Sequence, residues 1–335
     1  MVQELGWFDV VDVATAGEAR CAAARAGERC GLDDVRVREL ASAVAELGNN
    51  LHEHAGGGRI AVRALHRSGL RGIEIVAVDT GPGMPGFPGC SRAECSAEQL
   101  RGGLGAAVRL ASRHDGYSLP GRGTVVTIQF WPRGVYPAAF VATGLTRPML
   151  GEQISGDRFG MVLRDDGPIL LVADGLGHGP LAEEASRSAA EAFYSATTDS
   201  PAELVEAIHH TIAHTRGAAV AIARLEPSVG VVRFAGLGNI AAAVVGTPDG
   251  AGARRTGMVS QPGVAGHQRG TVHESCYPLG PGDLVILHSD GVVDRWDLAA
   301  YPGLAHHDPL VVAATLLRDA GVRRDDACVL VARSY

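Results

Sequence analysis

The strongest constraint on this chain is an acidic residue that follows a short apolar run and precedes a glycine-rich turn. Residues 169–173 read Ile-Leu-Leu-Val-Ala, and Asp174 and the glycine-rich turn of residues 175–179 follow directly. A short apolar run bounded by a turn signal predicts a buried β-strand. Asp174 therefore stands at the end of a buried strand, where an ionised carboxylate is costly unless a cation or hydrogen bonds compensate it.

The same pattern recurs along the C-terminal half. An apolar run at 284–287 leads to Asp290, the pair Asp325-Asp326 precedes an apolar run at 328–332, and Asp157 shortly precedes a fourth. Asp-Gly is also common in ordinary hairpin turns, and any one of these sites alone could be such a turn. The occurrence of all of them in this order disfavours that interpretation. Carboxylates with no Cys or His at ligand spacing suit Mg²⁺ or Mn²⁺. The sequence therefore predicts a divalent-metal site at strand ends.

This motif series resembles the SpoIIE/RsbX-type metal-dependent serine/threonine phosphatases over residues 150–335. The segment Gly236–Asn239 resembles the glycine-Asn turn of that family, between its second and third acidic motifs. The resemblance implies a β-sandwich flanked by helices, with a two-metal site at one end of the sheets. It also implies hydrolysis of phosphoserine or phosphothreonine with two Mn²⁺ or Mg²⁺ ions.

The resemblance implies a role for each acidic residue. Asp174 would bridge the two ions and Asp157 would act through water, and Asp174 and Asp290 are the catalytic candidates. Asp325 is favoured over Asp326 because the family uses the leading Asp of the matching pair, and the sequence leaves this choice open. The implied metal ligands are Asp157, Asp174, Gly175 (through its carbonyl), Asp290 and Asp325.

One expected residue has no clear match. Some relatives use an arginine to bind the substrate phosphate, and here the nearest candidate is Arg158, which follows Asp157 directly.

The N-terminal half carries a second, independent set of motifs. Apolar residues at helical spacing predict an amphipathic helix over residues 35–55, in which Glu46 and Asn50 lie on the same face. A strand at 73–78 leads into Asp79-Thr-Gly-Pro-Gly, and a Gly-Gly-Leu-Gly run at 102–105 opens a helix. A glycine-rich helix N-terminus is a common anion site. A Gly-Arg-Gly-Thr run at 121–124 then leads into a strand.

Taken in order, these motifs resemble GHKL ATP-binding domains, in particular the RsbT/RsbW-like switch kinases, up to residue 132. The resemblance implies that Asn50 helps to hold Mg²⁺ on ATP and that Glu46 orients or deprotonates the attacking hydroxyl. Asp79 would accept a hydrogen bond from the adenine amino group. The other implied nucleotide-binding residues are Gly81, Gly83, Gly103, Gly105 and Thr124.

The segment before the Gly-Leu-Gly motif departs from that family. Related lids are rich in Gly, Ser and Thr, whereas residues 92–101 are helix-prone, carry Glu94 and Glu98, and contain no glycine. Two interpretations stay open. The domain is an ATP-binding serine/threonine kinase, which Glu46 favours, or a non-catalytic module that sequesters a sigma factor or STAS protein, which the altered lid favours.

Length and composition agree with two domains. A chain of 335 residues suggests two, and the motifs place an ATP-binding domain at 1–132, a linker at 133–149 and a phosphatase domain at 150–335. We therefore expect an α/β (α+β) protein, a GHKL α/β sandwich followed by a β-sandwich flanked by helices. The short, proline-containing linker favours two independent modules.

Charge and apolar runs limit the partners and the compartment. A net charge of −7 offers no basic surface for nucleic acid. No apolar run reaches bilayer length and the first 13 residues carry acids, so we expect neither a membrane span nor a signal peptide. Six Cys without a CxxC motif favour a reducing cytoplasm.

The sequence therefore predicts a bifunctional partner-switching regulator. Its phosphatase would act on a STAS-type antagonist or a stressosome-like scaffold protein, and its N-terminal module would bind ATP with Mg²⁺. Two opposing activities on one chain raise the local concentration of both sites around one target.

Overall fold

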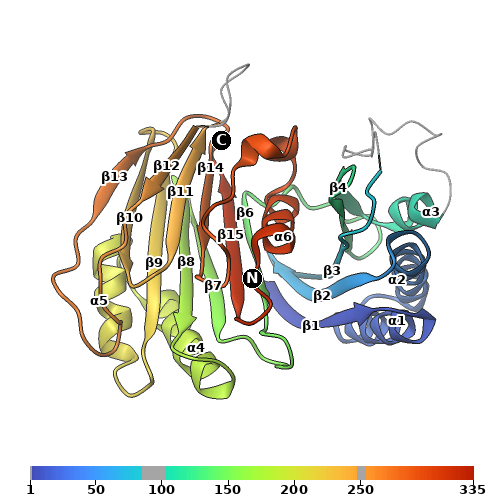
Figure 1. Ribbon diagram of the computed structural model, residues 1–335, viewed down its shortest axis with the longest axis horizontal. Helices are drawn as coiled ribbons and strands as arrows, with labels where there is room; N and C mark the ends of the chain where they lie inside the picture. The colour runs from blue at the N-terminus through green and yellow to red at the C-terminus, as the bar shows by residue number, and fades with distance from the viewer. Residues whose placement is uncertain (1, 85–102, 247–253) are drawn as a thin grey trace. The chain divides into compact units, whose positions relative to one another are not determined.

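The computed structural model describes residues 2–84, 103–246 and 254–335, which form two compact units (Figure 1). Unit 1 comprises Met1–Ala139 and His306–Arg318, and unit 2 comprises Phe140–Ala305 and Asp319–Tyr335. Every strand pairing between named strands of the three sheets is antiparallel, and helices lie between groups of strands. The expected α+β class is therefore confirmed.

Unit 1 contains a five-stranded sheet in the order β1-β2-β3-β5-β4. One face packs on the helices, and its alternating apolar residues Ile60, Val62, Ile73 and Ile75 share a core with Leu40 of the second helix. The elements are β1 (Val2–Val10), α1 (Val13–Arg29), α2 (Asp34–Ala55), β2 (Gly58–Arg67), β3 (Leu70–Val78), α3 (Gly103–Leu110), β4 (Arg113–Leu119) and β5 (Gly123–Phe130).

Local signals fix the ends of the two long helices. Asp33 caps α2 by accepting a hydrogen bond from the Arg36 backbone N–H, and Gly56 ends it at φ 72°. α2 matches the helix expected at 35–55. α1 was not predicted, although Asp12 and Thr15 form a capping box at its start, which is a readable N-terminal signal.

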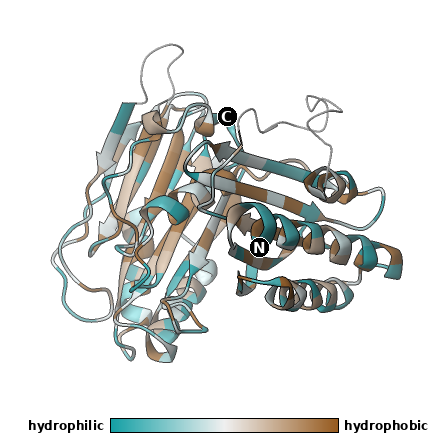
Figure 2. Ribbon diagram, turned by 45° about the vertical axis from the view of Figure 1, so that its right-hand side comes forward, coloured by the Kyte–Doolittle hydropathy of each residue, from teal (hydrophilic) through white to brown (hydrophobic). Residues whose placement is uncertain are grey.

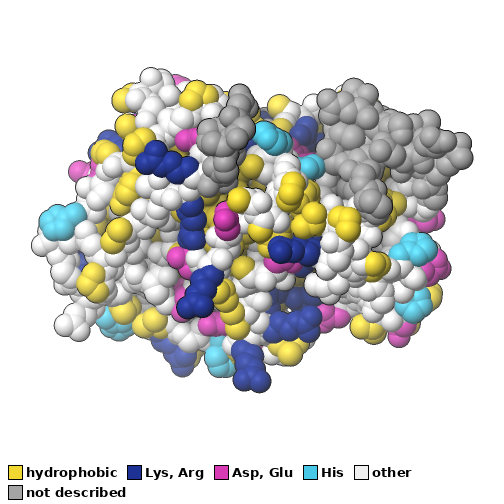
Figure 3. Space-filling model, turned by 45° about the horizontal axis from the view of Figure 1, so that its top comes forward, with side chains coloured by type: hydrophobic (Ala, Val, Ile, Leu, Met, Phe, Trp, Pro, Cys, Tyr) yellow, Lys and Arg dark blue, Asp and Glu magenta, His cyan; other side chains and the backbone are white. Residues whose placement is uncertain are grey.

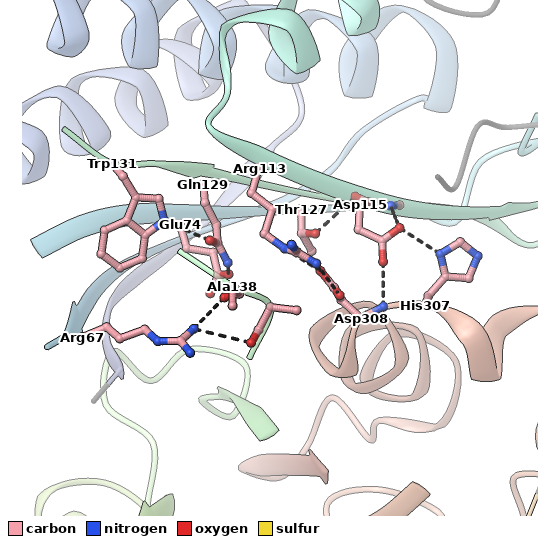
Figure 4. Close-up of polar contacts among 12 residues, drawn as sticks. Arg67, Glu74, Arg113, Asp115, Thr127, Gln129, Trp131, Ala138, His307 and Asp308 are labelled. Atoms are coloured by element: carbon pink, nitrogen blue, oxygen red, sulfur yellow. Dashed lines mark hydrogen bonds and ion pairs between the residues drawn. The ribbon is translucent and has the colours of Figure 1, made fainter. Parts of the chain in front are cut away.

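The other face of this sheet carries a buried polar network (Figure 4). Arg63 forms an ion pair with Glu74 at 2.9 Å, and both side chains are almost fully buried. Gln129 donates to Glu74 and accepts from the Trp131 indole N–H. Burial raises the pKa of Glu74, and the Arg63 charge opposes that shift. The network pairs the charges of Arg63 and Glu74, either of which would be costly to bury without a partner.

The same face of unit 1 also holds the segment His306–Arg318, which contains most of α6 (Pro309–Ala320). Arg113 of β4 forms an ion pair with Asp308 at 2.9 Å, and the Asp115 carboxylate bonds both the His307 ring and the Asp308 backbone N–H (Figure 4). A segment distant in sequence is thereby attached to β4.

Unit 2 is a β-sandwich of two five-stranded sheets, in the orders β13-β10-β9-β8-β7 and β12-β11-β14-β15-β6. Alternating apolar residues of both sheets meet in one core, among them Leu170, Val172, Val285 and Leu330. Figure 2 shows the apolar character of these strands. The opposite face of the β8–β9 sheet packs under α4 and α5, as Figure 1 shows, and this confirms the expected helix-flanked sandwich.

The elements of unit 2 have the following bounds. The strands are β6 (Ala142–Arg147), β7 (Asp157–Arg164), β8 (Gly167–Gly175), β9 (Ala218–Glu226), β10 (Val231–Leu237), β11 (Ala241–Gly246), β12 (Arg254–Met258), β13 (Ser275–Pro278), β14 (Leu284–His288) and β15 (Ala327–Arg333). The helices are α4 (Pro180–Ser195) and α5 (Pro201–Thr211), with short 3-10 turns at Leu298–Ala300 and Leu304–His306.

The expected linker at 133–149 is not irregular throughout. Its residues 142–147 form β6, which pairs with β15 from Ala327↔Arg147 to Ala332↔Ala142. The segment Ala-Thr-Gly-Leu-Thr-Arg alternates too weakly to read as a strand, and pairing with the apolar β15 supplies the missing stabilisation.

No helix in the described ranges is long and apolar enough to cross a membrane. On the face shown in Figure 3, basic and acidic side chains are interspersed.

Candidate functional site

The first acidic pair lies at the ends of two neighbouring strands in unit 2. Asp157 opens β7, Asp174 lies near the end of β8, and the two residues stand directly opposite each other in the antiparallel ladder. Asp157 is 4% exposed, and its carboxyl also accepts a hydrogen bond from the Ser289 hydroxyl at 2.5 Å. The register therefore brings together two of the four acidic motifs.

Burial and mutual repulsion change the acidity of this pair. Burial, followed by repulsion from Asp157 and Asp290, raises the pKa of Asp174 to about 10. Burial also raises the pKa of Asp157, to about 7, although the Ser289 hydrogen bond opposes the shift. Carboxylates that repel one another in a buried position are a typical feature of functional sites, because a bound cation compensates them.

Ser289 connects the third acidic motif to this pair. Its hydroxyl accepts the Cys328 backbone N–H and donates to Asp157, so that the ends of β14, β15 and β7 are tied together. Asp290 follows directly and is exposed, and the Asn239 amide donates to its carboxylate at 2.6 Å. Ser289 and Asn239 were not predicted as site residues, although the motifs Ser-Asp-Gly and Gly-Leu-Gly-Asn contain them.

The glycine of the Asp-Gly motifs has a packing role. A Cβ on Gly291 would lie 1.8 Å from the Asp326 carbonyl oxygen, and one on Gly175 would lie 2.0 Å from the Ala182 carbonyl oxygen. Glycine is thus required by close backbone approach at both acidic loops, rather than by a hairpin turn.

The neighbouring carboxylates Asp325 and Asp326 differ in their surroundings. Asp326 is 3% exposed and its two oxygens accept the Met149 and Gly156 backbone N–H groups, each at 2.8 Å. Asp325 is more exposed, and burial together with the Asp290 charge raises its pKa. Asp326 therefore holds two loops together, whereas the Asp325 carboxylate interacts with the acidic cluster.

The acidic residues of unit 2 offer oxygen ligands for a metal ion, but they are not drawn together around one point. Among the described residues, no group of three His, Cys, Asp or Glu side chains converges closely enough to hold an ion. Asp157 and Asp174 instead face each other across the β7–β8 ladder. The set is nevertheless chemically suited to hard divalent cations, because all of its donors are oxygens and no basic side chain in the described part of the chain forms an ion pair with Asp157 or Asp174.

In unit 1, Asp79 follows β3 and is fixed by two backbone donors. Its Oδ1 accepts the Gly81 N–H at 2.8 Å and the Thr124 N–H at 3.1 Å, and burial raises its pKa. Oδ2 accepts no hydrogen bond from a described residue, so one carboxylate oxygen is left for a ligand. Thr124 also pairs its hydroxyl with that of Ser118.

Glu46 and Asn50 on α2 converge on the start of α3. A Cβ on Gly103 would lie 2.1 Å from a Glu46 carboxylate oxygen and 3.8 Å from the Asn50 amide oxygen. The Asn50 Nδ2 is buried and has no hydrogen-bond partner among the residues that the structure describes. Buried polar atoms are rarely left unsatisfied, so this amide fits a bound polar ligand at the N-terminus of α3.

The remaining predicted glycines lie around the same region. A Cβ would lie 2.7 Å from Ala55 at Gly81 and 2.3 Å from the Leu119 carbonyl oxygen at Gly83, where φ is 67°. Gly105 is buried within α3. The expected lid at 92–101 lies outside the described residues.

Comparison with known families divides the chain in the same way. Residues 10–130 match the family of the histidine kinase-like ATPase domain, and residues 164–335, just over half of the chain, match the family of Stage II sporulation protein E (SpoIIE).

Individual relatives cover each half. The serine/threonine-protein kinase RsbT of Bacillus subtilis (strain 168) is 31% identical over 107 residues, which are 31% of this chain and 78% of that protein. A chain from a structure of the bacterial stressosome is 28% identical with a TM-score of 0.50, covering 57% of this chain and 98% of its own. RsbX, solved with magnesium, shares the fold at 20% identity and a TM-score of 0.50, covering 58% of this chain and 94% of its own.

The acidic strand ends of unit 2 and the helix, strand and glycine motifs of unit 1 therefore lie in two regions of known family. The chain belongs to the SpoIIE family through residues 164–335, and joins to it an N-terminal histidine kinase-like ATPase domain related to RsbT.

Proposed function

We propose that unit 2 is a divalent-metal-dependent phosphatase of phosphoserine and phosphothreonine side chains. The observation that supports this most is the opposed pair of the buried Asp157 and the half-buried Asp174, with Asp290 and Asp325 beside it, in the SpoIIE-family region. The repulsion among these carboxylates fits a site for two Mn²⁺ or Mg²⁺ ions.

Each chain residue has a distinct task in this proposal. Asp174, the Gly175 carbonyl, Asp290 and Asp325 would hold the ions, and Asp157 would contribute through a water molecule. Divalent ions activate water and neutralise phosphate charge. Asn239 orients the Asp290 carboxylate through its 2.6 Å hydrogen bond. Ser289 holds Asp157 in place and keeps the ends of three strands in register.

We also propose that unit 1 binds ATP with Mg²⁺ and acts as a protein serine kinase. Oδ2 of Asp79 would accept a hydrogen bond from the adenine amino group, because Oδ1 already accepts hydrogen bonds from two backbone N–H groups. Asn50 would help to hold Mg²⁺-ATP, with its buried Nδ2 donating to a phosphate oxygen, and Glu46, which lies against the same glycine, would accept a proton from the attacking hydroxyl. The backbone N–H groups at Gly103 and Gly105 face the phosphates at the N-terminus of α3.

Together, these sites suit a cytoplasmic partner-switching regulator whose target is a STAS-type antagonist or scaffold protein. The likeness of the N-terminal region to RsbT, a serine/threonine-protein kinase, and of the chain to a stressosome component supports this choice. One chain would then add and remove phosphate on the same class of target.

The phosphatase proposal is tested by following phosphate release from a phosphoserine peptide and from p-nitrophenyl phosphate. We expect release that requires Mn²⁺ or Mg²⁺ and is lost in EDTA. Asp174→Asn should lower it on the order of a hundredfold or more, whereas Asp165→Asn, an exposed aspartate in the β7–β8 turn, should not. Full activity in excess EDTA would contradict the proposal.

The kinase proposal has a separate test. Calorimetry should detect ATP and ADP binding, and radiolabelled phosphate should pass from ATP to a candidate STAS protein. Glu46→Gln should abolish transfer while nucleotide still binds. Nucleotide binding without transfer by the unmutated chain would instead favour a non-catalytic module that sequesters a STAS protein or a sigma factor.

A further inference from the structure

Two loops of unit 2 begin at the same end of the β7–β8 ladder. Asp157 and Asp174 stand directly opposite each other in that ladder. One loop, residues 148–156, leads into Asp157, and the other, residues 176–179, leads from the end of β8 into α4. Because paired residues of an antiparallel ladder are neighbours, both loops start beside the carboxylate pair. A ligand at that pair therefore lies next to both loops.

Hydrogen bonds fix the first loop at both of its ends. The Asp326 carboxylate accepts the Met149 N–H near its start and the Gly156 N–H at its end, each at 2.8 Å. The Leu150 N–H also donates to the Arg323 carbonyl at 3.0 Å. The loop is thus attached to the residues that precede β15.

The two loops also contact each other. The Nδ1 atom of His178 lies 3.0 Å from a carboxylate oxygen of Glu152. A Cβ on Gly156 would lie 2.7 Å from the Cβ of Ala182, which is in the first turn of α4. The two loops and the first turn of α4 therefore form one continuous surface beside the carboxylate pair.

This surface carries exposed apolar side chains. Of the five exposed Leu and Ile side chains in the described part of unit 2, four lie on it, and the fifth, Leu163, lies toward the other end of β7. Single exposed apolar residues are ordinary, whereas several of them at one place mark a binding surface. We call these four residues the apolar rim: Leu150, Ile154, Leu176 and Leu181.

Charged side chains of the same region are paired within the chain. Glu152 is paired with His178, as described above. Arg158, which the sequence offered as the nearest candidate for binding phosphate, forms an ion pair with Glu183 of α4 at 2.8 Å. These groups already have partners, whereas the side chains of the apolar rim face solvent.

We propose that the apolar rim binds apolar side chains that flank the phosphorylated residue of a protein substrate. This proposal rests on the proposed phosphatase function and adds to it what surrounds the phosphate. An extended chain advances about 3.3 Å per residue, so residues within two positions of a bound phosphoserine lie within about 7 Å of it along the chain. Those residues pass over the two loops, and burial of apolar side chains against the rim stabilises the complex.

The test uses the full chain with Mn²⁺ and four phosphoserine peptides. The peptides differ only in the two residues on each side of the phosphoserine, which are all leucine, serine, lysine or aspartate. The wild type should hydrolyse the leucine peptide with the highest kcat/KM. In the double variant Leu150→Ser, Ile154→Ser this value should fall about 10-fold, chiefly through KM, to that of the serine peptide.

The double variant should keep the other properties of the wild type. p-Nitrophenyl phosphate has no flanking residues, so its hydrolysis should be unchanged. Mn²⁺ affinity and melting temperature should also be unchanged, because both substituted side chains are exposed.

The double variant Leu163→Ser, Val229→Ser is the matched control. Leu163 and Val229 are 57% and 71% exposed, which is comparable to 68% for Leu150 and 47% for Ile154. Leu163 pairs with Pro168 near the β7–β8 turn, and Val229 lies in the turn after β9, so both are at the end of the sheet opposite to the acidic loops. The control should have wild-type kinetics on every peptide.

Several results would overturn the role of the apolar rim and leave the phosphatase standing. One is equal or lower kcat/KM of the wild type on the leucine peptide than on the other peptides, or hydrolysis of p-nitrophenyl phosphate alone. Another is a loss in Leu150→Ser, Ile154→Ser that p-nitrophenyl phosphate or the control variant shares. A changed oligomeric state of that variant in light scattering would also overturn it, because the rim would then bind a second copy of the chain.

The failure of the phosphatase proposal has a different signature. No phosphate release by the unmutated chain from any peptide or from p-nitrophenyl phosphate, with Mn²⁺ or Mg²⁺, would overturn the phosphatase and the role of the apolar rim with it.

Discussion

Replacing Asp174 by Asn should make the metal-free protein more stable at neutral pH. The carboxyl is half-buried beside Asp157, and burial together with repulsion raises its pKa to about 10. In the unfolded chain the same group ionises near pH 4. The folded state therefore holds a proton that the unfolded state releases, and the free energy of unfolding falls as pH rises from about 4 toward the folded pKa.

The size of the effect follows from that shift. Holding a proton costs about 1.36 kcal/mol for each pH unit above the unfolded pKa, and solvent that reaches Asp174 screens part of it, so we expect about 2–3 kcal/mol at pH 7.5. An asparagine has no ionisation to suppress, and its amide donates to Asp157. The metal-free variant should then melt about 5–10 °C above the wild type at pH 7.5.

Thermal melts followed by circular dichroism in EDTA, at pH 5 and pH 7.5, measure this difference. We expect the difference in melting temperature to shrink at pH 5 and to reverse when Mn²⁺ is added, because only the wild type retains the full set of metal ligands. Asp165→Asn, an exposed aspartate in the same unit, should show no such pH dependence. Equal stability of metal-free wild type and Asp174→Asn at both pH values would refute the repulsion argument.

Four further changes test other parts of the structure. Asp79→Asn should weaken ATP binding in calorimetry by about 10-fold to 100-fold, because the amide would present a donor to the adenine amino group. Asp326→Asn should lower the free energy of unfolding by about 1–3 kcal/mol in urea titrations, because one of two backbone N–H groups loses its acceptor. Asp325→Asn should instead weaken Mn²⁺ binding and leave stability unchanged. Arg63→Met should cost about 3–5 kcal/mol in urea titrations, because Glu74 is left buried and unpaired, and adding Glu74→Leu should recover most of it.

Strong local patterns predicted most of the elements that carry the proposed sites. The apolar run before Asp174 formed β8, and the helix expected at 35–55 formed α2, since periodicity and turn residues agree with the tertiary structure at both places. β6 was missed because a six-residue edge strand gains its stability from β15 and not from its own alternation.

Such local patterns do not predict contacts between residues that are distant in sequence. Nothing in the neighbourhood of Asp326 indicates that it holds Met149 and Gly156, which are more than 160 residues away. The position of Ala218 opposite Gly175 likewise depends on the β8–β9 register, which pairs residues across two helices. Sequence reasoning identified residue types at strand ends, and the sheet register decides which of them meet.

The path of the chain bears on whether the two units act independently. A short linker with prolines favours independence, but it is not the only covalent connection between the units. His306–Arg318 packs within unit 1, where Asp308 and His307 bind β4, and in sequence this segment lies between Asp290 and Asp325. Asp290 and Asp325, both proposed as metal ligands, are therefore joined by a stretch of chain that includes a segment of the ATP-binding unit. That stretch is a second covalent connection between the two units, besides the linker.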